Sequence, residues 1–170
     1  EYGENAVERI LGSNNQVVIL RTSWLMSHRG NNFVKTILNL LSKKDEISVI
    51  KDQIGSLTST YSLAKACEKI IEKFSYSKKG PPLRMHWSNL GSASWFEIAT
   101  KIKDISLDKG LIYKNSKINP SESNKFLSIA KRPIYSVLDC QSTYKILNFE
   151  PYHWEDELSE IIVNIKNDLK

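Results

Sequence analysis

The sequence predicts an α/β fold, because short apolar runs that suit buried strands alternate three times with segments of helical spacing. Irregular polar stretches follow these alternations. The chain has no glycine-rich G-x-x-G-x-x-G loop, the motif with which such folds bind a dinucleotide. We therefore expect residues 1–170 to form a single unit, half of an α/β protein without its dinucleotide-binding half.

The composition is that of a globular protein and limits the kinds of partner. Of the 170 residues, 41% are hydrophobic and 25% are charged, both ordinary values. No apolar run approaches the roughly 20 residues of a membrane span, so we expect no membrane partner. The net charge is +5, but acidic residues lie between the scattered lysines, which indicates a solvated surface and no nucleic-acid partner.

The cysteines and histidines give no catalytic or metal-binding motif. Cys67 and Cys140 lie far apart, and neither has a partner at metal-ligand spacing. Two free thiols favour a reducing compartment, so we expect a cytoplasmic protein. His28, His86 and His153 are dispersed and form no triad or ligand set, although His28 lies in a loop of interest.

Local patterns predict each element of the first half. Helical spacing of apolar residues predicts a helix over 1–11 that a turn at 12–15 ends. The run at 17–20 predicts a strand buried on both faces. The next elements are a helix over 33–41, a strand over 47–50, a turn at 52–55, and a helix over about 61–74 that Thr58 or Ser59 caps.

The second half is expected to contain two longer helices and several loops. Ser94 and Glu97 form a capping-box pattern at the start of a helix over 95–105. The other expected elements are strands over 83–87 and around 111–113, loops at 120–125 and 128–138, a short helix that Asp139 caps and that extends to 147, and a closing amphipathic helix over 154–169.

A polar loop after the first strand is the candidate ligand site. Arg21, Trp24, Asn31, Asn32 and Lys35 lie at or just past the end of that strand, where α/β sheets bind ligands. One aromatic face, two amides and two cations suit a sugar that carries phosphates. A core tryptophan beside a solvated loop would show the same spacing, so both interpretations remain open on spacing alone.

The stretch RTSWLMSHRGNNFVKT at 21–36 resembles the loop after the active-site helix of dTDP-4-dehydrorhamnose reductases, members of the extended short-chain dehydrogenase/reductase class. Further matches follow in order: IKDQIGSLT at 50–58, SWFE at 94–97, KRPIYSVLD at 131–139, and Trp154. They cover nearly the whole chain. The resemblance implies the carboxy-terminal part of an extended Rossmann-type reductase, with residual parallel strands and a small substrate-binding lobe.

The resemblance also implies a reaction. NADPH or NADH would deliver a hydride to the C4 ketone of dTDP-4-dehydro-L-rhamnose, giving dTDP-L-rhamnose for polysaccharide precursors such as those of O-antigen. The catalytic Tyr-x-x-x-Lys would precede Glu1, because Gly3-Glu4 matches the Gly-Glu that follows it. We therefore expect no catalytic residue in this chain and no activity from it alone. Tyr61 and Lys65 share the spacing, which we interpret as coincidence.

By match to the family's motifs, the substrate-binding residues would be Trp24, Asn32, Lys35, Gln53 and Arg132. Trp24 would pack on the CH face of the sugar. Asn32 and Lys35 would reach the nucleotide or phosphate side, Gln53 would face the same crevice, and Arg132 would clamp the diphosphate. A turn-stabilising amide at Gln53 and a surface arginine at Arg132 are the alternatives.

The chain departs from the family pattern at three places. Leu57 replaces a proline, which removes a rigid residue from a turn, and His153 replaces an aspartate before the last tryptophan. Leu25-Met26 replaces a pair such as Val-Tyr, which leaves the exact sugar open. Some family members form magnesium-bridged dimers, but no acidic residue here matches their ligands, so magnesium and a homodimer of the full-length protein remain open.

Two other functions also remain open. The regulatory β subunit of methionine adenosyltransferase shares the fold and several motifs, and it acts as a binding partner. A sibling enzyme, such as an epimerase of another nucleotide sugar, would also carry them. A Tyr-x-x-x-Lys upstream of Glu1 would favour an enzyme, and its absence would favour the regulatory protein.

Overall fold

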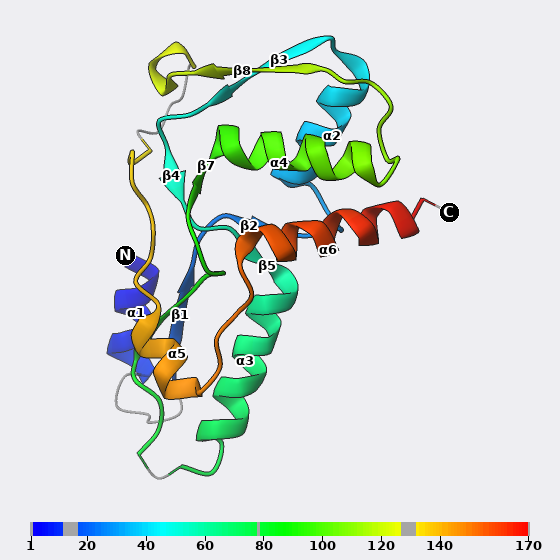
Figure 1. Ribbon diagram of the computed structural model, residues 1–170. Helices are drawn as coiled ribbons and strands as arrows, with labels where there is room; N and C mark the ends of the chain where they lie inside the picture. The colour runs from blue at the N-terminus through cyan, green and yellow to red at the C-terminus, as the bar shows by residue number, and fades with distance from the viewer. Residues whose placement is uncertain (1, 12–16, 78, 127–131, 170) are drawn as a thin grey trace.

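The computed structural model describes residues 2–11, 17–77, 79–126 and 132–169 and has an α/β architecture (Figure 1). Its strands are β1 (Ile19–Thr22), β2 (Leu25–Met26), β3 (Glu46–Ile50), β4 (Ile54–Gly55), β5 (Thr58–Ser59), β6 (Arg84–Trp87), β7 (Ala93–Ser94) and β8 (Lys117–Ser121). Its helices are α1 (Tyr2–Leu11), α2 (Phe33–Lys43), α3 (Thr60–Phe74), α4 (Trp95–Asp108), η1 (Ser123–Lys125), α5 (Gln141–Leu147) and α6 (Trp154–Asn167). No helix among the described residues is long and apolar enough to cross a membrane.

The described strands pair two by two. β1 pairs with β6, β2 with β5 and β3 with β8, and all three of these pairs are parallel. β4 and β7 form an antiparallel pair. Because β1 and β6 run in the same direction, their carboxyl ends lie on the same side, and the loop that carries Trp24 begins there. This arrangement confirms the predicted α/β class with parallel strands.

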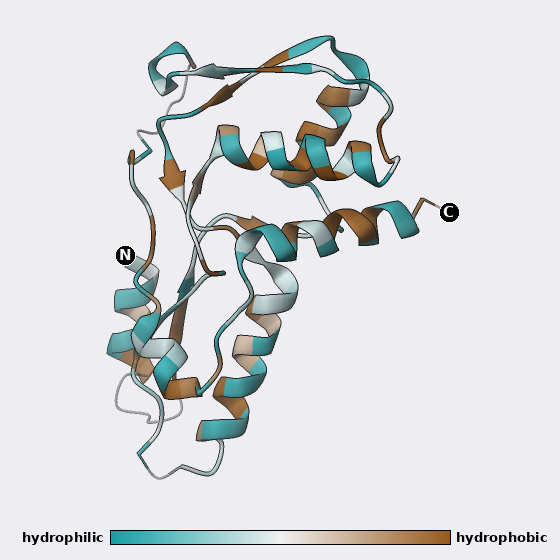
Figure 2. Ribbon diagram, in the orientation of Figure 1, coloured by the Kyte–Doolittle hydropathy of each residue, from teal (hydrophilic) through white to brown (hydrophobic). Residues whose placement is uncertain are grey.

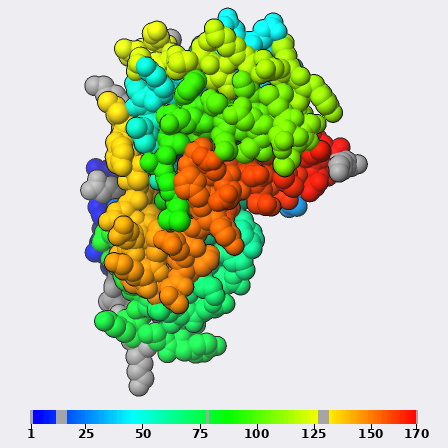
Figure 3. Space-filling model, in the orientation of Figure 1, coloured from blue at the N-terminus to red at the C-terminus, as the bar shows by residue number. Residues whose placement is uncertain are grey.

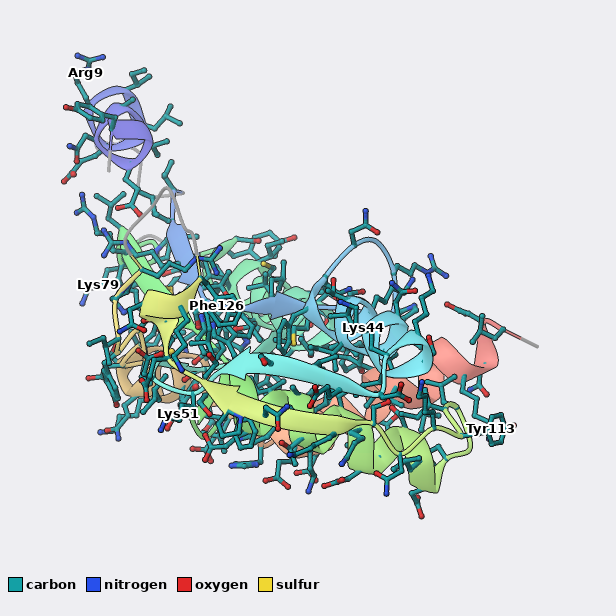
Figure 4. All side chains as sticks on the ribbon, turned by 90° about the horizontal axis from the view of Figure 1, so that it is seen from above. Arg9, Lys44, Lys51, Lys79, Tyr113 and Phe126 are labelled. Atoms are coloured by element: carbon teal, nitrogen blue, oxygen red, sulfur yellow. The ribbon has the colours of Figure 1, made fainter. Side chains whose placement is uncertain are left out.

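The upper region, formed by β3, β8, α2, α4 and α6, holds the larger hydrophobic core. The β3–β8 pair lies over α2 and α4, with α6 beneath α4 (Figure 1), and the two strands lie side by side when seen from above (Figure 4). Hydrophobic residues recur along these helices (Figure 2), and Val34, Leu41, Ile102, Leu158 and Ile162 are completely shielded from solvent. Burial of this apolar surface is the main stabilising term for the region.

The lower region, formed by β1, β6, α1, α3 and α5, has a smaller core around Trp87. The Trp87 ring stacks on Phe149 at a centroid distance of 5.4 Å and meets the edge of Tyr144 at 5.2 Å. Its Nε1 donates a hydrogen bond of 2.9 Å to Ser62 Oγ, so the buried indole N–H is satisfied. The Tyr144 hydroxyl donates to Ser88 O, and burial raises the pKa of this phenol.

Helix α1 lies at one edge of the lower region, apart from the main body in the view from above (Figure 4). None of its residues is buried. Arg21 Nε donates to Glu4 Oε1 at 2.8 Å, and Arg84 pairs with Glu8. The Arg21 hydrogen bond holds the pKa of the Glu4 carboxyl below its usual value. Exposed ion pairs of this kind fix the helix with little net stabilisation.

The C-terminal segment joins the two regions, with α5 on the lower region and α6 crossing the middle of the face in Figure 3. A buried polar network supports this junction. Asn89 Oδ1 accepts from Ser59 N at 2.9 Å, and Asn89 Nδ2 donates to Tyr152 O at 3.1 Å. The Ser59 hydroxyl donates to the buried Glu157 of α6. The loop around β5 is thereby held against the start of α6.

The structure confirms the predicted caps of α3 and α4, whereas the N-cap of α5 is Cys140 and not the predicted Asp139. Ser94 and Glu97 form the predicted capping box at the start of α4. Ser59 caps α3 by accepting a hydrogen bond from Ser62 N at 2.9 Å. His153, the residue that replaces the family's aspartate, caps α6 because its Nδ1 accepts from Glu155 N at 3.5 Å.

The predicted fully buried strand at 17–20 is wrong in both bounds and burial. The strand begins at Ile19, its first two residues are half-buried, and its last two are exposed. Among the described residues β1 pairs with β6 alone, so its apolar side chains are only partly covered. The turn predicted at 12–15 and the first part of the loop predicted at 128–138 lie outside the described residues.

Two predictions in the second half are also wrong. Residues 111–113 form no strand, because Leu111 N and Ile112 N both donate to Ser106 O and close the end of α4. Residues 117–121 form β8 instead, so Pro120 belongs to a strand and not to the predicted loop. Leu169 is 73% exposed and does not extend the buried face of the last helix, since α6 ends at Asn167.

Candidate functional site

A crevice of about 410 Å³ opens between α2, β3 and the start of α4, and we name it the α2–β3 crevice. It is lined by Phe33, Thr36, Ile37 and Leu40 of α2, Ser48, Val49 and Ile50 of β3, and Trp95, Phe126 and Arg132. Most of these side chains are apolar, three are aromatic, and one carries a positive charge. This combination suits a ligand with a flat apolar part and an anionic part.

Trp24 lies next to this crevice in a constrained conformation. Its φ of 41° falls in the left-handed region, which a bulky side chain rarely adopts. Its carbonyl accepts a hydrogen bond of 3.2 Å from Thr58 N, which ties the residue to β5. Its half-buried ring stacks on Trp95, with 3.7 Å between ring centroids and 15° between ring planes.

Trp95 connects Trp24 to the crevice. The Trp95 ring also contacts the Phe33 ring, with 4.5 Å between ring centroids and 56° between ring planes. Trp95 and Phe33 both line the crevice, whereas Trp24 reaches it through Trp95. The three rings form a continuous aromatic row that runs from the loop after β1 to α2.

Gly55 of the Asp-Gln-x-Gly motif leaves room for the Trp24 ring. A Cβ atom at Gly55 would lie 2.5 Å from Trp24 Cε2, 2.6 Å from Cζ2, and 2.9 Å from Ser136 Oγ. Any side chain at this position would therefore push the ring away. The pairing of β4 with β7 also places Gly55 opposite Ala93, close to the start of α4 and to Trp95.

Gln53 and Asp52 of the same motif have different surroundings. Gln53 is 93% buried, and we find no hydrogen bond from its amide among the described residues. Asp52 accepts hydrogen bonds from Ser123 N at 2.9 Å and from Ser123 Oγ at 2.7 Å, which ties the end of β3 to η1. The Ser123 hydroxyl holds the pKa of Asp52 below its usual value. Asp52 thus joins the end of β3 to η1, whereas Gln53 makes no such side-chain contact among the described residues.

Asn32, predicted as a substrate contact, makes its side-chain hydrogen bonds within the chain. Its Oδ1 accepts from Val34 N at 3.1 Å and Lys35 N at 3.5 Å, which makes it the N-cap of α2. Its Nδ2 donates to Ser27 O at 2.8 Å and to Arg29 O at 3.3 Å. Because the amide is engaged on both sides within the chain, we leave Asn32 out of the proposed substrate contacts.

The structure brings together some, but not all, of the other predicted site residues. Arg132 lines the α2–β3 crevice and is exposed, as a clamp for an anion requires. Trp24 adjoins the crevice, and Gln53 lies two residues before the glycine that contacts Trp24. Lys35 lies in the first turn of α2, half-buried, but is not one of the lining residues found for the crevice. Arg21 points to Glu4 instead.

Three aromatic side chains that line the crevice, Phe33, Trp95 and Phe126, are not among the site residues that the sequence predicts. Trp95 belongs to the SWFE match, but the match alone assigns it no contact. The signal available was that match itself, because its tryptophan follows an N-cap and must lie at the start of a helix. Nothing in the local pattern could show which ring it would meet.

A second concavity, of about 520 Å³, lies between the start of α3 and α6 and is lined in part by His28, Tyr61 and Glu157. Tyr61 and Lys65 therefore lie away from the α2–β3 crevice, and Lys65 pairs with Glu68 at 2.8 Å. Within the described ranges, no group of three or more His, Cys, Asp or Glu side chains could hold a metal ion. We derive no step through magnesium.

Comparison with known proteins identifies the family. The family model described as "RmlD substrate binding domain" matches residues 1–167. The "Spore coat polysaccharide biosynthesis protein SpsK" of Bacillus subtilis is 38% identical over 85% of this chain and 46% of its own length. The "dTDP-4-dehydrorhamnose reductase" of Aggregatibacter actinomycetemcomitans is 29% identical over 94% of this chain and 55% of its own.

Solved structures give the same result. A dTDP-4-dehydrorhamnose reductase of Clostridium acetobutylicum superposes with a TM-score of 0.81 and 33% identity, over 96% of this chain and 53% of that one. A dTDP-4-dehydrorhamnose reductase of Bacillus anthracis in complex with NADP gives 0.79 and 34%, over 95% and 52%. This chain spans about half the length of the relatives it matches. The chain belongs to the RmlD substrate-binding domain family.

Proposed function

We propose that this chain is the substrate-binding part of a dTDP-4-dehydrorhamnose reductase, which uses NADPH or NADH to reduce dTDP-4-dehydro-L-rhamnose to dTDP-L-rhamnose. The observation that carries the proposal is the α2–β3 crevice, with Arg132 on its wall and an aromatic row that ends at Trp24. A thymidine diphosphate sugar has a flat base, two phosphates and a sugar with an apolar face. The crevice and the adjoining Trp24 together offer a matching group for each part.

In this proposal, different residues contact different parts of the ligand. Phe33 and Phe126 provide apolar and aromatic surface for the thymine and its ribose. The Arg132 guanidinium binds the diphosphate, because its planar fork of N–H groups matches phosphate oxygens. Trp24 lies at the far end of the row, next to the motif of Gln53, and receives the sugar. The buried amide of Gln53 supplies a hydrogen bond to a polar group of that sugar.

The chemistry is a two-electron reduction, to which this chain contributes binding and orientation. When bound, the nicotinamide cofactor supplies the hydride that forms the new C–H bond at C4. The ketone oxygen takes a proton from the family's tyrosine, which this chain does not contain, and becomes the hydroxyl of the product. The sequence has no glycine-rich dinucleotide motif, so we place the cofactor on the part of the protein that precedes this chain.

The lower region supports the view that a further part completes the protein. The strand β1 is half-exposed, and α1 presents Tyr2 and Ile10 to solvent at 94% and 69% exposure. A dinucleotide-binding half packed there would cover these surfaces. We therefore propose that residues 1–170 alone are inactive and poorly soluble. The mass of the complete protein in solution tests whether it forms a homodimer.

The compartment and the alternatives follow from the same proposal. Cys67 and Cys140 are both free, as a reducing cytoplasm requires, so we keep the cytoplasmic assignment as a prediction. A solved UDP-glucuronic acid 4-epimerase of Bacillus cereus has a TM-score of 0.70 at 16% identity, which shows a shared fold only. No observation favours an epimerase or a regulatory subunit.

A hydride-transfer assay of the complete protein tests the proposal. Oxidation of NADPH and of NADH is followed by absorbance with dTDP-4-dehydro-L-rhamnose and other dTDP-4-keto sugars. We expect turnover with dTDP-4-dehydro-L-rhamnose and formation of dTDP-L-rhamnose. Binding of dTDP without turnover of any keto sugar would contradict the reductase and favour a non-catalytic relative.

A further inference from the structure

Trp95 occupies a fixed place between two parts of the candidate site. It is the first residue of α4, directly after the N-cap Ser94. Ser94 N and Ser94 Oγ both donate to Glu97 Oε2, at 2.7 and 2.8 Å, and Glu97 N donates to Ser94 Oγ at 3.2 Å. Ser94 also belongs to β7, which pairs with β4. The backbone that carries the Trp95 ring is therefore fixed from both sides.

The ring of Trp95 contacts both ends of the aromatic row. Its face stacks on Trp24 at 3.7 Å, and it meets Phe33 at 4.5 Å. It also lines the α2–β3 crevice together with Arg132. Phe96, the next residue of α4, makes no ring contact with Trp24 among the aromatic contacts found in the described chain. The stack is thus a property of one side chain and not of the helix end in general.

Trp24 needs support of this kind. Its left-handed backbone conformation is unfavourable for a bulky side chain and persists only where the surroundings hold it. The structure supplies three restraints: the hydrogen bond from Thr58 N to its carbonyl, the Trp95 ring against its face, and the bare backbone of Gly55 beside its ring. Of these, Trp95 alone also touches the crevice.

We propose that Trp95 is a positioning residue that holds the Trp24 indole in place for the sugar. Binding of the nucleotide in the crevice and binding of the sugar at Trp24 then both depend on the Trp95 ring. This inference rests on the proposed function. It makes Trp95 a determinant of how much affinity the sugar adds to that of dTDP. The part of the affinity that comes from dTDP itself depends on Arg132 and on the apolar walls.

The test compares two ligands, dTDP and dTDP-L-rhamnose, in the complete protein by calorimetry. We call the Kd of dTDP divided by the Kd of dTDP-L-rhamnose the sugar ratio. In the unaltered protein we expect a sugar ratio of about 10, which corresponds to one well-packed aromatic contact. In Trp95→Leu this ratio should fall to about 1–2, whereas Phe96→Leu, the matched control, should keep it. Trp95→Phe retains a ring and should recover part of the ratio.

A spectroscopic signal reports the stack independently of binding. Two indoles stacked in this way give an exciton couplet in far-ultraviolet circular dichroism. The couplet should be present in the unaltered protein and in Phe96→Leu, and absent in Trp95→Leu and Trp24→Ala. The double variant Trp24→Ala/Trp95→Leu should have the same sugar ratio as either single variant, because the two residues act as one unit.

Gly55→Ala displaces the Trp24 ring without removing Trp95. This variant replaces Trp95→Leu in the test if Trp95→Leu does not fold. It should lower the sugar ratio and weaken the couplet, since its Cβ meets Trp24. A sugar ratio that stays near 10 in Trp95→Leu, while the couplet is lost, would overturn the role of Trp95. Failure of the unaltered protein to bind either dTDP ligand, with the couplet intact, would overturn the proposed function, and the positioning role would fall with it.

Discussion

The upper and lower regions of the molecule differ in how completely their cores are closed. In the described chain the upper core contains 18 buried residues around α2, α4 and α6, whereas the lower core contains five around Trp87. The upper region also carries the α2–β3 crevice, while the lower region has half-exposed β1 and the unburied helix α1. A rigid, well-filled core behind a binding crevice holds its walls in place, and a loosely covered region suits docking of a further part.

Core truncation should show this difference most strongly. Ile162→Ala in the upper core should lower the free energy of unfolding by about 3–4 kcal/mol, because Ile162 is fully buried and a cavity would remain. Leu63→Ala in the lower region should cost about 1–2 kcal/mol, because Leu63 is only half-buried. Urea unfolding of the complete protein measures both, and equal losses would contradict the comparison.

Removal of the positive charge of Arg132 should have the next largest effect, and this effect should appear in ligand binding. Arg132→Ala should weaken dTDP binding by about 10- to 100-fold, the value of a charge-assisted contact with phosphate. Arg132→Lys should recover part of the loss, since lysine keeps the charge but not the planar fork. Arg9→Ala is the control, because Arg9 lies on α1, which stands apart from the main body in Figure 4, and this variant should leave affinity unchanged. Unaltered affinity in Arg132→Ala would remove Arg132 from the site.

Loss of the Trp24 ring should act on the sugar end of the site. Trp24→Ala in the complete protein should raise KM for the sugar nucleotide by about 10-fold or more, because the proposed site places the Trp24 ring against the sugar. Steady-state kinetics with varied sugar nucleotide measure this change. Unchanged kinetics would exclude Trp24 from the substrate site.

The Asn32 amide distinguishes a capping role from a ligand role. Asn32→Ala should lower the free energy of unfolding by about 1 kcal/mol, the usual cost of a lost N-cap. Asn32→Ser keeps a capping oxygen and should recover most of that stability. The affinity for dTDP should stay the same in both variants, and a large loss of affinity with intact stability would restore Asn32 as a ligand.

The smallest effect concerns the link between β3 and η1. Because the Ser123 hydrogen bond lowers the pKa of Asp52, folding favours the ionised carboxylate. Its contribution is present above the ordinary pKa of 3.8 and is lost as the pH falls below that value. Asp52→Asn cannot titrate, so its stability should fall less steeply than that of the unaltered protein between about pH 4 and 2. Identical acid unfolding curves would show that the link carries no pH dependence.

The comparison of regions also separates what could be predicted from what could not. The capping box of Ser94 and Glu97 spans four residues, so the sequence predicts the start of α4 directly. The stack of Trp24 on Trp95 joins residues far apart in the chain, and only the packed fold brings them together. The strand that contains Pro120 has weak local signals and forms because β3 pairs with it.

The candidate site residues divide in the same way, into those that the sequence predicts and those that only the packed fold brings together. The motif match predicted Arg132 and Trp24 near one another, and the structure places both around the aromatic row. Asn32 shows the limit of a motif match, because an asparagine before a helix is both a good cap and a good ligand, and the sequence does not show where its hydrogen bonds go. Phe33 and Phe126 were missed because an apolar ring that lines a crevice has the same sequence pattern as one that fills a core.

The central claim is that the α2–β3 crevice binds a nucleoside diphosphate, and a crystal structure of the complete protein with dTDP tests it most directly. We predict the thymine between the side chains of Phe33 and Phe126 and the diphosphate on Arg132, with the open end of the phosphate directed toward Trp24. A structure with dTDP in the concavity between α3 and α6, or with the crevice empty at saturating dTDP, would contradict this account.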